Sequence, residues 1–307
     1  MKITVLGDLL YDCFIWAPRL PRMGETVTGD RNGFYAGGKG GNQAVQCVRL
    51  GAEVSMIGKV GVDPRGDFLL ENLRREGIRT EYVFREGETG TCCVHVDHAG
   101  HNAIIVAPLA NETMRVEEVR RAEAQITASD ILLVQLQVNE EAVTEALKIA
   151  ARAGVRTVLN PAPARAVPES YFDLVEFWTP NETEAEFFTG CAQNGQAPEV
   201  WCRTAAECLR SKGARNVIIT LGEHGCFYSG AEGEALVPPY PVNAVDSTAA
   251  GDSFNAAFCV ALAEGRPLPE ALLRGNAAGA LTASRHGSQP SMPDRQALET
   301  MMRRKEP

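Results

Sequence analysis

The sequence predicts an α/β protein built on a doubly wound, mostly parallel sheet. Short, almost entirely apolar segments recur along the chain, as at residues 131–136 and 216–220. Segments with helical spacing of apolar residues, such as 139–153, separate them. Fully apolar strands that alternate with helices are typical of a parallel sheet covered by helices on both faces.

The individual elements follow this alternation from the N-terminus onward. Residues 2–6 form a β-rich run that ends at Gly7-Asp8, and a glycine cluster at 37–41 opens a helix that runs to about Leu50. The other expected strands are 54–57, 131–136, 155–159, 174–178, 216–220 and a late piece at 236–242. The other expected helices are 63–76, 139–153, 181–189, 199–212 and 253–263.

Two β-rich segments interrupt the alternation. Residues 11–36 hold prolines and glycines among short β-branched pieces, and residues 91–96 and 103–106 flank a polar turn. Such patterns are typical of surface hairpins rather than of core strands. Because no linker or internal repeat divides the chain, we expect one domain, residues 1–307, on which segments 11–36 and 90–106 form a small β-sheet lid.

The composition argues against several classes of partner. The chain has 307 residues, of which 45% are hydrophobic and 22% charged, and its net charge is −9. Because an acidic surface repels nucleic acid and anionic membranes, we expect neither as a partner. The chain shows no signal-peptide pattern and no apolar run near about 18 residues. Its nine cysteines lack Cys-x-x-Cys spacing, so we expect a cytoplasmic protein with reduced thiols.

The segment Val245-Asp-Ser-Thr-Ala-Ala-Gly-Asp252 carries the strongest chemical signal. Ala249, Ala250 and Gly251 precede a helical pattern, so they would open a helix whose first amides lack partners within it. Such amides, free of bulky side chains, can close on an anion. Asp252 would repel that anion, which makes sense if it accepts a proton from a hydroxyl group attacking a phosphate. The alternative is that Asp252 is an ordinary first-turn acid of a helix.

Polar motifs follow several of the expected strands. Ligands of an open parallel sheet bind beyond the carboxyl ends of its strands, so these motifs predict one shared site. The motifs are Gly7-Asp8, Asn160-Pro-Ala-Pro163, Thr179-Pro-Asn-Glu-Thr-Glu-Ala-Glu186, Thr220-Leu-Gly-Glu-His-Gly225 and the stretch from Asp246 to Asp252.

The ordered set of motifs resembles the PfkB-type, ribokinase-like carbohydrate kinases. Gly37-Gly-Lys-Gly-Gly-Asn42 stands near one end of the chain and Asp246-Ser-Thr-Ala-Ala-Gly-Asp-Ser-Phe-Asn255 near the other, with the three central motifs between them. The resemblance covers nearly the whole chain. It implies transfer of the γ-phosphoryl group of ATP to a hydroxyl of ribose or a close relative, giving the 5-phosphate. It also implies Mg²⁺, K⁺ as an activator, and a homodimer formed through the lid.

The resemblance also assigns roles to individual residues. Asp252 would be the base, and the amides of Ala249, Ala250 and Gly251 the anion hole. The sugar would be held by Asp12, Gly37, Gly38, Lys39, Gly40 and Asn42, at a site that Leu10 and Gln137 also border. ATP would contact Asn181, Thr220, Gly222, Gly225 and Asn276, with Glu184 near Mg²⁺ through water. The monovalent cation would lie among Asp246, Thr248, Thr282, Arg285, Gly287 and Ser291.

Two residues depart from the family pattern. Leu10 stands where a sugar-binding asparagine is usual, and Gln137 replaces a glutamate. Leucine cannot pair with a hydroxyl group, and an unpaired buried polar group costs about 1–3 kcal/mol. Our hypothesis is that the preferred sugar lacks or displaces a hydroxyl relative to ribose, as 2-deoxyribose does, although ribose itself fits the other motifs.

Alternative functions stay open at this point. A kinase of another carbohydrate or of a nucleoside would share the motifs, and a sugar-sensing protein could keep the fold without catalysis. A nicotinamide-dependent dehydrogenase is disfavoured because Gln43 stands where the dinucleotide fingerprint requires glycine. His95, His98 and His101 are expected at a solvated hairpin tip rather than around a metal ion.

Overall fold

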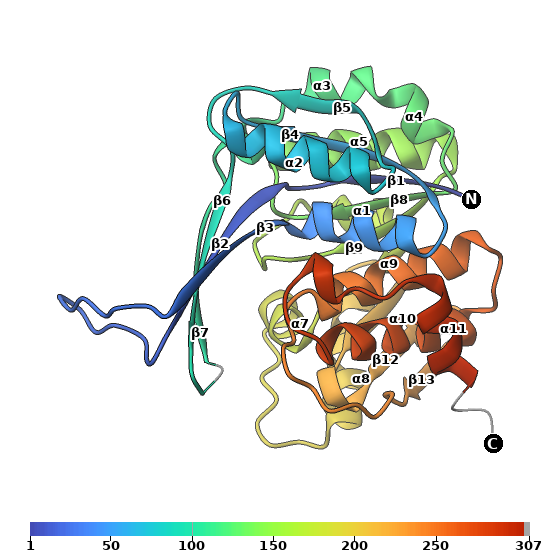
Figure 1. The fold of residues 1–307 in the computed structure, drawn as a ribbon. Helices are drawn as coiled ribbons and strands as arrows, with labels where there is room; N and C mark the ends of the chain where they lie inside the picture. Colours follow the sequence, from blue (N-terminus) through green and yellow to red (C-terminus); the bar gives the residue numbers. More distant parts are fainter. Residues whose placement is uncertain (100, 304–307) are drawn as a thin grey trace.

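The computed structural model describes residues 1–99 and 101–303, which form a large sheet with helices on both faces and a separate small sheet (Figure 1). The strand order of the large sheet is β13-β12-β11-β10-β9-β8-β1-β4-β5. Its strands are β1 (Lys2–Leu6), β4 (Glu53–Val60), β5 (Arg79–Arg85), β8 (Ile131–Gln135), β9 (Arg156–Asn160), β10 (Phe177–Trp178), β11 (Asn216–Thr220), β12 (Cys226–Gly230) and β13 (Gly233–Val237).

The pairing within the large sheet is parallel from β5 to β11, and the strands β12 and β13 add an antiparallel edge. Every residue of β8 is buried, because its side chains alternate between two apolar layers: Ile131 and Leu133 enter one, Leu132 and Val134 the other. The predicted fold class, a doubly wound and mostly parallel sheet with a small additional sheet, is confirmed.

Helices cover the two faces of the sheet as two groups. One face carries α1 (Lys39–Arg49), α2 (Pro64–Arg75), α9 (Ala250–Ala263), α10 (Leu268–Ala283) and α11 (Arg295–Arg303). The other carries α3 (Val116–Arg121), α4 (Glu123–Thr127), α5 (Glu140–Ala153), α6 (Tyr171–Leu174), α7 (Glu182–Thr189) and α8 (Pro198–Ser211). None of the helices in the described part of the chain is both long and apolar enough to cross a membrane.

Two of the expected strands differ from the structure. In the segment 174–178, only Phe177–Trp178 is extended, and Tyr171–Leu174 forms α6 instead. Tyr171 explains the helical turn, since its buried ring packs under α5 and its hydroxyl donates to the carbonyl of Glu140 at 3.2 Å. In the segment 236–242, the strand ends at Val237 because Pro238 and Pro239 have no N–H to continue the ladder.

The small sheet, which we call the lid, projects from the body in Figure 1. Its strand order is β3-β2-β6-β7, with the two hairpins joined by the parallel pair β2 and β6. The strands are β2 (Leu10–Ala17), β3 (Arg31–Gly37), β6 (Thr91–Asp97) and β7 (Asn102–Ala107). A small apolar cluster of Leu10, Phe14, Cys92 and Val94 holds the sheet together. His98 and His101 lie exposed near its far end, each against a different aspartate.

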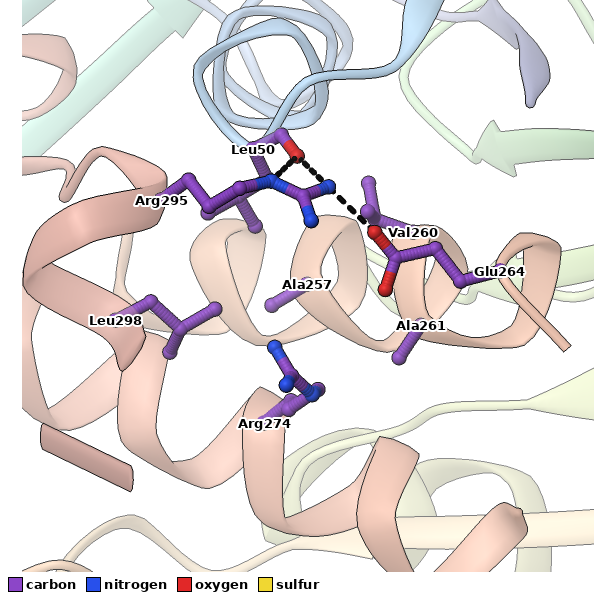
Figure 2. Close-up of a pocket in the computed structure, with 8 residues that line it drawn as sticks. All are labelled: Leu50, Ala257, Val260, Ala261, Glu264, Arg274, Arg295 and Leu298. Atoms are coloured by element: carbon purple, nitrogen blue, oxygen red, sulfur yellow. Dashed lines mark hydrogen bonds and ion pairs between the residues drawn. The ribbon is translucent and has the colours of Figure 1, made fainter. Parts of the chain in front are cut away.

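Arginine side chains connect helix α11 to its neighbours α1, α9 and α10 (Figure 2). Nε of Arg295 donates to the carbonyl of Leu50 at 2.8 Å, just after α1, and the same guanidinium pairs with Glu264 at the end of α9. Arg274 of α10 lies across the same small cavity and pairs with Glu299 of α11 at 2.7 Å. These contacts hold α1, α9, α10 and α11 as one layer.

Candidate active site

A polar pocket lies at the carboxyl ends of β9, β10 and β11. Asn160 ends β9, Thr179 follows β10 and Thr220 ends β11, so the parallel order brings these residues to one edge. The pocket is lined by Lys39, Asn160, Thr179, Asn181, Glu184, Thr220, Ser247, Ala249, Gly251, Asp252 and Asn255. Motifs spread over most of the sequence therefore meet in one place.

Asp252 stands in the first turn of α9, 6% exposed, with both carboxylate oxygens engaged. Asn42 Nδ2 donates to its Oδ2 at 2.9 Å, and Gln43 Nε2 donates to its Oδ1 at 2.9 Å. Burial raises the pKa of Asp252, and the positive charge of Lys39 opposes that rise. The carboxylate is thus held in one orientation by two amides of α1.

The turn before Asp252 leaves room for a ligand. Ala249 adopts φ 61°, a left-handed conformation uncommon for alanine, and this bend starts α9. Apart from its chain neighbours and the backbone of α9 itself, no described atom lies within 4 Å of the position that a Cβ on Gly251 would take, so this position faces open space. The amide of Ala250 already donates to Ser247 O at 3.2 Å. Ala249 and Gly251 therefore have the amides best placed to receive an anion.

Asp12 and the glycine segment form the other side of the site. Asp12 is 7% exposed, and a Cβ on Gly37 would lie 2.0 Å from its carboxylate, so a side chain there would have to displace that carboxylate. Gly38 has φ 84° and Gly40 packs against the backbone of Asp8. The pKa of Asp12 rises to about 8, chiefly through burial and then through the charges of Asp8 and Asp252.

The two residues that depart from the family pattern lie near this side. Leu10 is buried in the lid cluster, against the backbone of Gly90. Gln137 lies partly exposed, two residues after β8. Strands β1 and β8 are parallel neighbours, so the chain segments that carry the two residues leave the sheet side by side.

Asn181 and Glu184 cap helix α7 and line the same pocket. Asn181 N donates to Glu184 Oε2 at 2.8 Å, and Glu184 N donates to Asn181 Oδ1 at 2.8 Å, which is a capping box. Thr220 pairs with Asn181 through an isolated parallel bridge. Burial raises the pKa of Glu184.

The remaining residues expected at ATP lie around the β11–β12 turn. Gly222 and Gly225 have φ 53° and 88°, and a Cβ on Gly225 would lie 2.1 Å from Val237 O. Asn276 of α10 is buried, and its Nδ2 donates to Val237 O at 3.2 Å and to Pro238 O at 3.1 Å. Its amide hydrogens are therefore occupied by the backbone that follows β13.

The segments expected around a monovalent cation lie side by side. Gly287 N donates to Asp246 Oδ2 at 2.9 Å, and Thr248 N donates to Asp246 Oδ1 at 3.0 Å. The hydroxyl of Thr282 instead faces Ser253, with 2.6 Å between the oxygens. Arg285 is exposed, and Ser291 Oγ donates to Ser288 O at 2.6 Å. Within residues 1–99 and 101–303, no group of three or more His, Cys, Asp or Glu could hold a metal ion.

Sequence reasoning assigned no role to two buried residues of this site, Asp8 of the Gly7-Asp8 motif and Gln43. Asp8 is fully buried after β1, and its Oδ1 accepts from Gly40 N at 2.9 Å, which caps the start of α1. Burial raises its pKa to about 6. Gln43 is equally buried and contacts Asp252. The available signal was an acid directly after the first strand and an amide directly after Asn42.

Comparison with known proteins places this geometry in a family. Residues 1–295 match the family described as pfkB family carbohydrate kinase. A ribokinase of Haemophilus influenzae is 39% identical, over 96% of this chain and 96% of that protein. A deoxyribokinase of Salmonella typhimurium is 33% identical, over 95% of this chain and 96% of that protein.

Solved structures agree over the whole fold. The crystal structure of a ribokinase from Thermotoga maritima has a TM-score of 0.89 at 34% identity, covering 98% of this chain and 99% of that one. The structure of Arabidopsis thaliana ribokinase complexed with ribose and ATP has a TM-score of 0.88 at 29% identity, covering 98% of both chains. Motifs, pocket and whole-chain similarity agree, and the chain belongs to the pfkB family of carbohydrate kinases.

Proposed function

We propose that this protein transfers the γ-phosphoryl group of ATP to the 5-hydroxyl of ribose, giving ribose 5-phosphate and ADP. Support comes from relatives named ribokinase that align along nearly the full chain. The observation that carries the proposal is the buried carboxylate of Asp252, held by two amides beside a turn that faces open space.

Asp252 acts as the general base in this proposal. Its carboxylate takes the proton of the sugar hydroxyl while the hydroxyl oxygen bonds to the γ-phosphorus and the bond to ADP breaks. The amides of Ala249, Ala250 and Gly251 stabilise the negative charge on the moving phosphoryl group, with Ala250 engaged in the ligand-free turn. Lys39 lines the same pocket and adds a positive charge.

The sugar lies between the lid and the glycine segment. The Asp12 carboxyl group pairs with sugar hydroxyls, and Gly37, Gly38 and Gly40 let the sugar approach the backbone closely. Lys39 and Asn42 add donors, and Gln137 borders the site as a neutral amide. Asn42 would donate to both the sugar and Asp252 through its two amide hydrogens.

The nucleotide lies over Asn181, Thr220, Gly222 and Gly225, with Asn276 shaping the pocket wall from behind. The donor set fits Mg²⁺, because the Glu184 carboxylate faces the pocket while keeping lone pairs free beyond its capping contacts. Glu184 would hold the ion through water, and Mg²⁺ bound with ATP would neutralise phosphate charge.

A monovalent cation, K⁺, fits the loop pair beside the turn. Asp246 holds the segments 246–248 and 282–291 together, and Ser288 Oγ is a buried oxygen without a partner in the described chain. Backbone carbonyls of Asp246, Thr248, Thr282, Arg285, Gly287 and Ser291 would supply oxygen ligands. Such an ion would steady the turn before Asp252 without touching either substrate.

A second candidate substrate is 2-deoxyribose. Leu10 puts a buried apolar side chain where the family pattern has an asparagine, and one relative is named deoxyribokinase. A sugar that lacks a hydroxyl would leave no polar group unpaired against leucine. A non-catalytic sugar sensor is less well supported, because both oxygens of the Asp252 carboxylate are held as a base requires.

The assembly and location follow the family. The lid exposes Phe34, Ile104 and Ile105, at 50%, 53% and 69%. Phe34 and Ile105 stand in one row across the sheet with Cys13 and Cys93 between them, so they share a face, whereas Ile104 points to the other face. Exposed apolar side chains on a thin sheet mark an interaction surface, and a second copy of this chain would cover them as a homodimer. We place the working protein in the cytoplasm, where its unpaired cysteines stay reduced.

An ADP-release assay with ribose, 2-deoxyribose, fructose and a nucleoside tests the function. We expect ribose to have the highest kcat/KM, with 2-deoxyribose next. We expect Asp252→Asn to lower kcat by about 10²–10⁴-fold while calorimetry still detects sugar and ATP binding. Turnover near wild type in Asp252→Asn would contradict the role of Asp252 as base. If no sugar supports ADP release, the kinase proposal fails and the sugar-sensing function is favoured.

A further inference from the structure

Gln43 lies between the strands and the catalytic carboxylate, fully buried on α1. Its Nε2 donates to Asp252 Oδ1 at 2.9 Å and to Asn160 Oδ1 at 3.1 Å, which uses both amide hydrogens. We infer that Gln43 is a positioning residue that fixes the orientation of the Asp252 carboxylate and favours its ionised form. The inference rests on the proposed role of Asp252 as base.

Gln135 at the end of β8 determines which way the Gln43 amide points. Gln135 Nε2 donates to Gln43 Oε1, so the oxygen of Gln43 faces the sheet and its nitrogen faces Asp252. The reversed amide would place an oxygen against the acceptor oxygens of Asp252 and Asn160. A relay of two amides thus connects the central strand to the base, and one orientation satisfies both donors of Gln43.

The same relay reaches the turn that would bind the phosphoryl group. Asn160 Nδ2 donates to Thr179 O at 3.3 Å, and Thr179 Oγ1 donates to Asn255 Oδ1 at 2.6 Å. Asn255 Nδ2 then donates to Gly251 O at 2.9 Å. Because the chain of contacts runs from Gln43 to Gly251, it fixes the base and the turn relative to each other. A hydrogen-bonded network of this kind holds a site rigid before substrate binds.

The charges around Asp252 explain why a neutral donor is needed. Lys39 is a cation that lowers the pKa of Asp252, whereas Asp8, Asp12 and Glu184 are acids near enough for charge coupling with it. Burial therefore disfavours the ionised form that a base must have, while the charge of Asp252 raises the pKa of Asp8, Asp12 and Glu184. Hydrogen bonds from Asn42 and Gln43 favour the ionised form of Asp252 without adding charge. Only Gln43 is itself held by a second side chain from the sheet.

The test is the pH dependence of kcat/KM for the sugar in the full-length Gln43→Met variant. Methionine keeps the length and volume of glutamine but cannot donate to Asp252. We expect kcat to fall about 10- to 100-fold, because a hydrogen bond to a charged group is lost. We expect the acid limb of the profile to move to higher pH by about one unit or more. KM for ATP should stay within the wild-type range.

Gln46→Met is the matched control. Gln46 lies on the same helix, is equally buried, and donates to Pro293 O at 3.0 Å rather than to Asp252. Its oxygen accepts from Ser253 Oγ at 3.4 Å, and its replacement removes a buried amide of the same kind while leaving both amide contacts of Asp252 in place. We expect lower thermal stability and an unchanged pH profile.

Gln135→Met keeps the test decisive if Gln43→Met does not fold. It leaves Gln43 and Asp252 in place and frees the Gln43 amide to turn, so a smaller shift of the acid limb in the same direction is expected. A wild-type pH profile in a folded Gln43→Met, or in Gln135→Met when the first variant is unfolded, would overturn the inference. If those pH profiles are wild-type and Asp252→Asn is inactive, the inference about Gln43 is wrong but the proposed role of Asp252 as base still holds. If Asp252→Asn is active, both the base and the positioning role of Gln43 are contradicted.

Discussion

Asp12 is a carboxyl group whose proton is bound more tightly in the folded protein than in the unfolded chain. Its pKa is raised to about 8 and that of Asp8 to about 6, in both cases chiefly by burial. The stability contributed by each bound proton is complete below the usual aspartate pKa and is lost as pH rises through the raised value. We therefore expect the ligand-free protein to lose stability as pH rises from about 4 to about 8. The cause is the burial of two acids at the proposed sugar site.

Asp12→Asn should remove the larger part of this pH dependence. We expect the variant to melt about 3 °C or more above the wild type at pH 9 and close to it at about pH 4, because the amide needs no proton to stay neutral. Thermal melts across this range measure the effect. Asp173→Asn, at an exposed position, controls for the change in net charge. Equal gains at both pH values would contradict the assignment, and loss of sugar turnover is expected throughout.

Leu10→Asn should shift the choice of sugar. An amide at this position could pair with a hydroxyl that leucine leaves unpaired, so we expect the ratio of kcat/KM for ribose over 2-deoxyribose to rise about tenfold. Leu10→Ala is the control, since it also weakens the lid cluster but adds no donor. An equal change in both variants would mean that Leu10 acts through lid packing and not through the sugar.

At the scale of single residues, the sequence identifies those that stand within recognisable motifs. Asp252 and Asn42 are among them, and they meet in the structure at 2.9 Å. Asp8 stands in the Gly7-Asp8 motif and Gln43 follows Asn42, but their roles depend on partners that spacing cannot place. Gln43 and Asp252 are 209 residues apart in the chain, and burial of an acid such as Asp8 depends on the folded surroundings.

At the scale of elements, the turn between β11 and β12 shows what each glycine does. Gly225 has φ 88° and lies against Val237 O, whereas Gly222 has φ 53° and no described atom within 4 Å of its missing Cβ. The first is required by both conformation and space, the second by conformation alone. The turn borders the proposed ATP pocket. Substitutions at Gly225 and Gly222 can therefore distinguish the effect of a close contact from the effect of backbone conformation alone.

Gly225→Ala should therefore be much more harmful than Gly222→Ala. We expect Gly225→Ala to destabilise the protein by about 2–3 kcal/mol and to raise KM for ATP, because its Cβ would collide with the β13 backbone. Gly222→Ala should cost about 1 kcal/mol. Denaturant unfolding and ATP kinetics on the same pair measure both effects. Similar losses in the two variants would show that the close contact with Val237 does not limit the turn.

Some elements could not be predicted because packing overrides local preference. Helix α10 contains Gly275 and Gly279, which argue against a helix in the sequence. A Cβ on Gly275 would lie 2.7 Å from the ring of Phe254, and one on Gly279 would lie 3.2 Å from Ala250 O. These glycines let α10 approach α9, so their value appears only when the two helices are together.

At the scale of the molecule, the lid is the part with least support from the body. Its outer strand β7 is exposed at every residue, and Ile105 lies opposite Cys93 on the neighbouring strand. The alternation of strands and helices predicts the large sheet and its hairpin additions. It does not predict the strand order or the parallel pair β2 and β6, because neither is encoded in the spacing between segments.

Ile105→Asp should separate the proposed dimer into monomers. A charge placed in an apolar contact between two lids would be buried without a partner, which association cannot tolerate. Light scattering coupled to size exclusion measures the mass. Val200→Asp, at an exposed apolar residue of α8 on the body, should keep the wild-type mass. A monomeric wild type, or a dimeric Ile105→Asp, would contradict an interface through the lid.

The contact of Asn42 and Gln43 with Asp252 joins segments that leave the ribosome far apart in time. The glycines proposed to bind the sugar are made early, whereas the proposed base and its turn come near the end of synthesis. A nascent chain or a truncated product that lacks α9 therefore contains no half-working centre able to waste ATP. Two separately expressed fragments, divided at a loop between these segments, should therefore restore activity only when both are present, because each lacks part of the proposed site.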